Sequence, residues 1–248
     1  METAALDNLY RLFAAYVKTF YCDDAEIQPK ILQKEEHSFI VAGLSGDLAR
    51  SLGLDDAETR LAEAIGLCHD FGRFRQATVY RTFRDADSVD HGRLGVEEML
   101  AAGVSDLVRP NDWEALAFAV RWHNAAALPA SDPRLTLHGR IIRDTDKLDI
   151  CRVLPPAPPA TGCSPQLEET FLAGKLLYYE DIRTADDRKL VMLSWLFDVN
   201  FSWTAREIAG RGYIDRLLAS LPPSAAMPAI RDKIGLLLAE FDSRKGSR

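Results

Sequence analysis

Four of the five histidines in this chain form an ordered series with aspartates. In chain order the set is His37, His69, Asp70, His91, His123 and the acidic pair Asp144 and Asp146. Neutral imidazoles and carboxylates are the ligands that Mn, Fe, Co, Ni and Zn accept in proteins. The sequence therefore predicts a site for one or two divalent transition metal ions, with Mg²⁺ as a further candidate.

The adjacent pair His69 and Asp70 restricts the backbone around such a site. Consecutive side chains on an α-helix diverge by about 100°, so both contact one ion only where a helix ends or distorts. Gly72, two residues later, is typical of a helix end. The other three histidines also fall near predicted helix ends, so several helices are expected to converge on one point.

Apolar residues recur at three- and four-residue spacing along most of the chain, which predicts an all-α fold. The predicted helices span residues 6–20, 39–52, 57–68, 94–101, 113–122, 135–153, 167–179, 188–200, 204–208, 214–219 and 230–241. Asp55, Asp56 and Asp112 are the expected helix caps. The segment from Arg73 to Asp87, with its aromatic and arginine residues, is predicted to be a loop.

The chain divides at a proline-rich segment. We expect a metal-binding helical core over residues 1–153, a linker over 154–166, helices over 167–243 packed on the same body, and a disordered tail over 244–248. The C-terminal helices carry no motif. Three roles remain open for them: completing the core, shaping the pocket, or forming a homodimer face.

Composition restricts the class of partner. The net charge of −7 over 248 residues argues against binding to a nucleic acid polymer or a membrane surface. The first residues lack the basic region of a signal peptide, and no apolar run is long enough to span a bilayer. Four cysteines without CxxC spacing are expected to be reduced thiols of a cytoplasmic protein.

Five fragments within residues 30–153 carry a family resemblance: KEEHSFIVAGLSGDLA, AIGLCHDFGRFRQ, SVDHGRLGVEEML, AVRWHNAAALP and IIRDTDKLDI. In this order they resemble the HD-domain superfamily of metal-dependent phosphohydrolases, which is named for its adjacent His-Asp pair. The resemblance implies an HD-domain-like helical bundle with additional C-terminal helices. It also implies hydrolysis of a phosphoric ester.

The resemblance assigns roles by position. The first metal ion would be held by His37, His69, Asp70 and Asp146. His91 and His123 match the subset of members that binds a second ion, and Asp70 would then bridge both ions. Asn124 stands where other members carry a second adjacent histidine, which favours two metal ions over three.

The resemblance also implies cations that bind phosphate. The lysine that often follows the His-Asp pair is here Arg73, which can bind phosphate through two nitrogens. Arg75 and Lys147 are further candidates for substrate binding. Asp70, Arg73 and Lys147 are then the expected catalytic residues, with water activated by two metal ions attacking a small phosphorylated molecule or a nucleotide. A cyclic-dinucleotide signature, GYP, is absent from the sequence.

Two other interpretations use the same residues. The ligand set also resembles the di-iron oxygenases of this superfamily, similar to myo-inositol oxygenase, in which the metal pair activates O₂. A non-catalytic metal-binding signalling module is the third interpretation. It fits less well, because degenerate members lack ligands and all six are present here.

Overall fold

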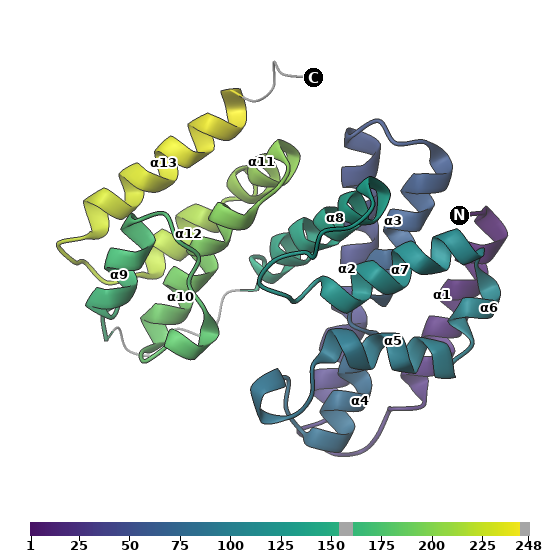
Figure 1. The fold of residues 1–248 in the computed structure, drawn as a ribbon. Coiled ribbons are helices and arrows are strands. Elements are labelled where there is room, and N and C mark those ends of the chain that lie inside the picture. Colours follow the sequence, from purple (N-terminus) through teal and green to yellow (C-terminus); the bar gives the residue numbers. More distant parts are fainter. Residues whose placement is uncertain (154–160, 244–248) are drawn as a thin grey trace. The chain divides into compact units, whose positions relative to one another are not determined.

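The computed structural model describes residues 1–153 and 161–243, and every regular element among them is a helix (Figure 1). The predicted all-α fold is therefore confirmed. The chain forms two compact units, Met1–Asp146 and Lys147–Arg248, and all six predicted metal ligands belong to the first.

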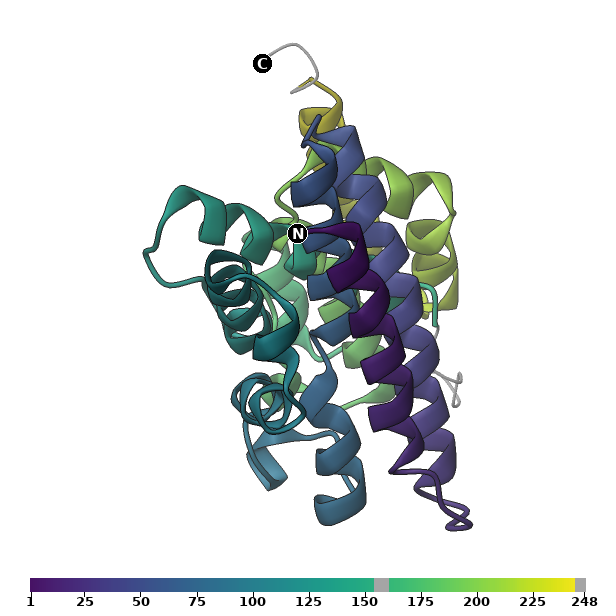
Figure 2. The same ribbon diagram turned by 90° about the vertical axis from the view of Figure 1, so that its right-hand side faces the viewer.

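Eight α-helices and one 3-10 turn make up the described elements that begin in the first unit. They are α1 (Thr3–Lys18), α2 (Gln28–Ser51), α3 (Asp56–Cys68), α4 (Phe71–Tyr80), η1 (Asp85–Asp87), α5 (His91–Ala101), α6 (Val104–Leu107), α7 (Pro110–Trp122) and α8 (Pro133–Ile150). Figure 2 shows α1 beside α2, where Tyr10 stacks on Phe39 and Phe13 meets the same ring edge-on. Among the described residues, α2 and α3 form the most extensive contact between two helices.

An aromatic core joins α1 to α4. Phe13, Phe71 and Phe74 are fully buried, and the Phe13 ring centroid lies 6.0 Å from Phe71 and 5.7 Å from Phe74. Tyr16 stacks on Phe71 with ring centroids 4.0 Å apart. Burying one such ring stabilises the fold by about 1.5–3 kcal/mol. Because Phe71 directly follows Asp70, this core fixes the point at which α4 begins.

Two glycines allow helix backbones to approach closely on either side of the His69–Asp70 pair. A Cβ atom on Gly66 of α3 would lie 2.7 Å from the Val41 carbonyl oxygen of α2. A Cβ atom on Gly72 would lie 2.6 Å from the His91 carbonyl oxygen of α5. The expected helix end at the His69–Asp70 pair is confirmed, because α3 ends at Cys68, but Gly72 is not the residue that caps it. Gly72 lies in the first turn of α4, where it brings α5 against that helix.

The predicted loop over residues 73–87 is wrong for its first half, which forms α4. Phe71, Phe74 and Ala77 are buried at three-residue intervals, so they form one helical face, and the arginines between them obscured this spacing. The helix α2 begins at Gln28, well before the predicted start at residue 39. His37 therefore lies inside a helix and not near its start.

The caps agree with the sequence at one helix and differ at another. The Asp55 side chain caps α3 by accepting hydrogen bonds from the backbone N–H groups of Ala57 and Glu58. The helix α7 begins earlier than predicted, at Pro110, because proline fits the first helical position. Asp112 consequently lies in the first turn and does not cap the helix.

The connection between α4 and α5 is attached to the connection between α1 and α2. Arg81 has a left-handed backbone, with φ of 58°, which is strained for a residue with a Cβ atom. Its guanidinium lies 2.7 Å from an Asp24 carboxylate oxygen and 2.9 Å from a Glu26 carboxylate oxygen. Its carbonyl oxygen accepts a hydrogen bond of 2.8 Å from Lys30 Nζ. We call these contacts the Arg81 clasp.

The second unit is also helical in its described part. Its elements are α9 (Pro165–Leu172), η2 (Tyr179–Asp181), α10 (Ala185–Ser194), η3 (Trp195–Asp198), α11 (Ser202–Gly210), α12 (Tyr213–Ser220) and α13 (Met227–Ser243). The helix α9 ends at Leu172 and not at the predicted residue 179. Gly174, two residues after this end, takes the left-handed conformation typical of a helix C-terminus. The predicted linker and tail fall partly or wholly on residues 154–160 and 244–248, outside the described residues.

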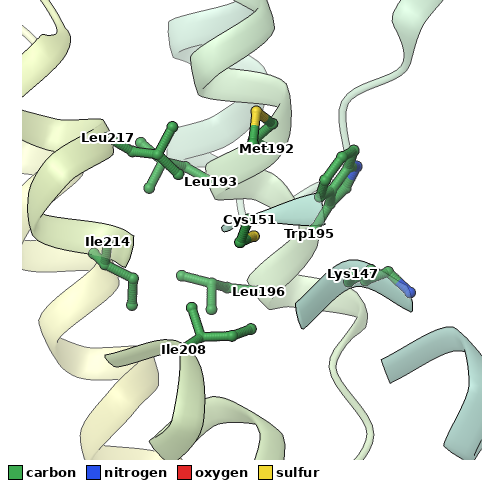
Figure 3. A pocket seen from close by; sticks show the side chains of 9 residues that line it. All are labelled: Lys147, Cys151, Met192, Leu193, Trp195, Leu196, Ile208, Ile214 and Leu217. Carbon is green, nitrogen blue, oxygen red and sulfur yellow. The ribbon is translucent and has the colours of Figure 1, made fainter. Parts of the chain in front are cut away.

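An apolar pocket in the second unit has a volume of about 10 Å³ and is lined by Cys151, Trp195 and several aliphatic side chains (Figure 3). That volume is about one water molecule, too little for an organic ligand. Within the described part of the chain, no helix combines the length and the apolar character that crossing a bilayer requires.

Substituting Gly66→Ala should separate α2 from α3 and lower the free energy of unfolding by about 1–3 kcal/mol, because backbone atoms cannot yield to the added methyl group. Gly43→Ala on α2 is the matched control, since no atom lies within 4 Å of the place its methyl group would take and alanine favours a helix by about 0.5–1 kcal/mol. Thermal unfolding of both variants tests this. Equal stabilisation of the two would contradict the close approach at Gly66.

Candidate metal centre

The six predicted ligands lie together in the first unit, carried by elements that are far apart in the sequence. Four of them occupy helix ends. His69 follows the last residue of α3, Asp70 precedes the first residue of α4, His91 is the first residue of α5, and His123 follows the last residue of α7. The other two, His37 and Asp146, project from within α2 and α8.

The first cluster consists of His37, His69, Asp146 and one oxygen of Asp70. The Nε2 atoms of His37 and His69 are 3.1 Å apart, and Asp146 Oδ1 lies 3.0 Å from the former and 3.6 Å from the latter. Asp70 Oδ2 lies 3.6 Å from His37 Nε2 and 3.4 Å from His69 Nε2. Four potential ligand atoms thus surround one point.

The second cluster takes the other oxygen of Asp70. His91 Nε2 and His123 Nε2 are 3.0 Å apart. Asp70 Oδ1 lies 3.7 Å from His91 Nε2 and 3.8 Å from His123 Nε2. The carboxylate of Asp70 is therefore divided, with one oxygen facing each pair of imidazoles.

Hydrogen bonds at the opposite ring nitrogens decide which atoms face each other. His123 Nδ1 donates to the Val120 carbonyl oxygen at 2.7 Å, and His91 Nδ1 donates to Asp85 Oδ2 at 2.6 Å. Because these acceptors hold the protons at Nδ1, neutral His91 and His123 face each other with two unprotonated Nε2 atoms. His69 Nδ1 is held in the same way by the Gly66 carbonyl oxygen, at 2.8 Å.

This donor set fits a metal ion better than it fits a hydrogen-bonded network. Two lone pairs directed at each other across 3.0 Å repel unless a cation lies between them. Two nitrogens that bind one ion at about 2.0–2.1 Å are themselves about 3 Å apart in adjacent coordination positions. The clusters can accordingly hold a metal ion each, although the identity of the metal does not follow from the ligands.

Protonation differs between the two clusters. Burial lowers the pKa of His91, and burial together with the neighbouring imidazoles lowers the pKa of His123 to about 3. Burial alone would lower the pKa of His69 as well, but the carboxylates of Asp70 and Asp146 outweigh it and raise that pKa to about 10. At neutral pH a metal ion entering the second cluster therefore displaces no proton, whereas one entering the first releases a proton from His69.

Two cations lie against the shared carboxylate. Lys34 Nζ is 2.6 Å from Asp70 Oδ2, and Arg73 Nε is 3.4 Å from Asp70 Oδ1. Both cations also lie 5.5 Å from the centre of the Phe83 ring. Although burial opposes it, nearby positive charge, with Lys34 the largest contributor, holds the pKa of Asp70 well below its ordinary value.

Sequence reasoning missed Lys34, although a signal was present. Lys34 and His37 are three residues apart, which places them on one face of a helix. That relation became visible only with the true start of α2 at Gln28. Asp85 was also missed, because the segment around it was treated as an undifferentiated loop.

The two remaining candidates for substrate binding, Arg75 and Lys147, each pair with an acidic side chain that is not one of the six predicted ligands. Arg75 is half exposed, and its Nε donates to Glu98 at 2.8 Å. Lys147 Nζ pairs with an Asp198 carboxylate oxygen at 2.7 Å within the second unit. His138, the fifth histidine of the chain, lies outside both clusters, and its Nε2 is 2.7 Å from a Glu58 carboxylate oxygen. The roles of Arg75 and Lys147 in binding substrate stay predictions.

Residues 35–151 match the HD domain family, and this range contains all six clustered residues. The resemblance predicted from the sequence is confirmed over that range. HD domains belong to a metal-dependent superfamily of the hydrolase type. Comparison with curated proteins gave no match, and neither did comparison with solved structures.

Substituting Asp70→Ala should remove both metal ions, because each cluster loses one of its carboxylate oxygens and the charge that the two ions would share. Metal content after loading with Mn²⁺ or Co²⁺ and dialysis measures the effect. Asp47→Ala, which removes an exposed carboxylate of α2 that pairs with Arg50, is the control and should retain wild-type content. Two ions per chain in the Asp70 variant would contradict the bridging role.

Proposed function

We propose that this chain, which carries an HD domain over residues 35–151, is a metal-dependent phosphohydrolase acting on a small phosphorylated substrate such as a nucleotide. The observation that supports the proposal most directly is the division of Asp70 between two pairs of imidazoles. A shared carboxylate with both oxygens in use is the arrangement that two-metal hydrolytic sites need.

In this proposal His37, His69 and Asp146 hold one ion, His91 and His123 hold the other, and Asp70 binds both. When bound, the ions would supply a water molecule activated for attack on phosphorus and positive charge for the phosphoryl oxygens. Carbonyl and carboxylate acceptors hold the Nδ1 protons of His69, His91 and His123, so Nε2 is the nitrogen that each ring directs toward the ions.

Lys34 and Arg73 supply the cations for the substrate. Lys34 lies beside Oδ2 of Asp70 and Arg73 lies beside Oδ1, so the two cations flank the carboxylate that the ions would share. Arg73 Nη1 already donates to Gln76, to the Phe83 carbonyl oxygen and to Asp85. Within the described residues Arg73 Nη2 has no such partner, so this nitrogen can bind a phosphoryl oxygen. Because Nη1 is already used, Arg73 cannot bind the phosphoryl group through both of its terminal nitrogens.

The proposed hydrolysis and the rival oxygen chemistry differ in what they consume. The metal-loaded protein should release inorganic phosphate from members of a panel of nucleotides and sugar phosphates under anaerobic conditions. Phosphate assays and an oxygen electrode, run on the same preparations loaded with Mn²⁺, Co²⁺ or Fe²⁺, separate the two. Substrate-dependent O₂ uptake with no phosphate release would replace this proposal with the oxygenase.

Substituting Lys34→Met should lower kcat/KM for the best phosphorylated substrate by about tenfold to a hundredfold, the loss expected for one charge-assisted hydrogen bond. Lys30→Met is the matched control: Lys30 lies one turn earlier on α2, and its ammonium donates to the Arg81 carbonyl oxygen. Steady-state kinetics of the two variants at equal metal content test the prediction. An equal loss in both would assign the effect to the charge of α2 and not to substrate contact.

A further inference from the structure

The carboxylate of Asp85 lies beside the predicted ligands without being one of them. Asp85 begins the short 3-10 turn η1 in the connection between α4 and α5. Its carboxylate accepts hydrogen bonds from the side chains of four residues: His91, Asn124, Arg73 and Gln76. The His91 backbone N–H approaches it as well, at 3.4 Å. This many donors around one partly exposed carboxylate fix its position closely.

The two oxygens of Asp85 face different groups. Oδ2 accepts from His91 Nδ1 at 2.6 Å and from Asn124 Nδ2 at 3.1 Å. Oδ1 accepts from Gln76 Nε2 at 2.9 Å and from Arg73 Nη1 at 3.1 Å. Oδ2 therefore binds the His91 imidazole of the second cluster, and Oδ1 binds Arg73, the cation that flanks Asp70.

His91 depends on this contact more than His69 and His123 depend on theirs. His69 and His123 donate from Nδ1 to carbonyl oxygens three residues earlier in their own helices, so regular helix geometry holds those rings. His91 is the first residue of α5, with no preceding turn to supply a carbonyl oxygen. The side chain of Asp85 takes the place of that carbonyl.

We propose that Asp85 is a positioning residue, which directs His91 Nε2 toward the second metal ion and holds Arg73 beside Asp70. This inference rests on the two-metal site of the proposed function. It assigns Asn124 a role as well, since the Asn124 amide supports the same oxygen that holds His91. Asn124, which stands where other members carry a further histidine, thus supports the second site through Asp85 and not as a metal ligand.

The contacts predict an effect confined to one of the two sites. No described hydrogen bond or ion pair joins Asp85 to His37, His69 or Asp146. Loss of Asp85 should accordingly lower the affinity of the second site for its ion and leave the affinity of the first site unchanged. Loss of a residue that served only the stability of the fold would lower the affinities of both sites together.

The test is a titration of metal-free protein with Mn²⁺ alone, which resolves a tighter and a weaker site by calorimetry and detects the coupled ion pair by electron paramagnetic resonance. Asp85→Asn keeps the volume of the side chain but can accept on only one side, and Asp85→Ala accepts on neither. Second-site affinity should fall about tenfold to a hundredfold in Asp85→Ala, with first-site affinity within about twofold of wild type and the coupled signal lost.

His123→Ala, which removes a ligand of the second cluster directly, is the positive reference. Asp87→Asn is the matched control, because Asp87 lies in the same turn and pairs with the exposed Arg84. Asp85→Asn, as the isosteric variant, carries the test if Asp85→Ala does not fold. Equal weakening of both sites, or unchanged binding at the second, would overturn the proposal.

The titration is independent of the reaction. Wild-type protein that binds two Mn²⁺ ions but releases no phosphate from any substrate would contradict the proposed function, while the site-selective effect of Asp85 would still stand. Wild-type protein that binds a single ion would overturn the role of Asp85 and leave a one-metal hydrolase possible. The two failures are therefore distinguishable.

Discussion

The buried carboxylate of Asp70 is the constraint on which the first unit depends. Removing a carboxylate from water costs several kcal/mol unless charges and hydrogen bonds replace the lost solvent. Here Lys34 and Arg73 supply positive charge, and four imidazoles surround the two oxygens. These groups come from α2, from the α3–α4 junction, from α5 and from the end of α7, so the helices must meet at this residue for its charge to be tolerated.

The junction between α3 and α4 provides that meeting point. No connecting residues separate the two helices other than His69 and Asp70 themselves. The carboxylate stands at the N-terminal end of α4, where the helix dipole favours negative charge. The glycines at 66 and 72 bring α2 and α5 against the same junction, since any side chain at either position would collide with a facing backbone.

Two kinds of support hold the imidazoles, and they differ in how strictly they depend on side chains. A carbonyl oxygen of the preceding turn is present wherever a helix ends regularly, and His69 and His123 use it. His91 opens its helix and needs a carboxylate from a separate turn. The second cluster is thus built with one ring held by the backbone and one held by a side chain.

The sequence predicts the members of this site better than it predicts the structure around them. The order of histidines and aspartates identified the cluster because ligand chemistry restricts which residue types can serve, and helical periodicity identified the fold class. Helix boundaries were less predictable. The start of α2 was placed too late because polar residues dominate its first two turns, and this concealed the relation between Lys34 and His37.

Asp85 could not have been found by periodicity at all. It lies in a turn whose position relative to His91 and Arg73 is decided by the packing of α4 against α5 and by the Arg81 clasp. Contacts of that kind join residues through space, and a single sequence carries no record of them. The helix α4 differs in this respect, because the spacing of Phe71, Phe74 and Ala77 does indicate a helix, and the arginines between them concealed that spacing.

The direct joining of α3 to α4 also determines which genetic changes this protein can tolerate. One residue inserted between His69 and Asp70 would turn α4 by about 100° and advance it by about 1.5 Å relative to α3. Phe71 and Phe74 would then leave the aromatic core at the same time as Asp70 leaves the imidazoles. Insertions and deletions at this junction are therefore far more damaging than most single substitutions in the core, so its length is more strictly fixed than its neighbouring side chains.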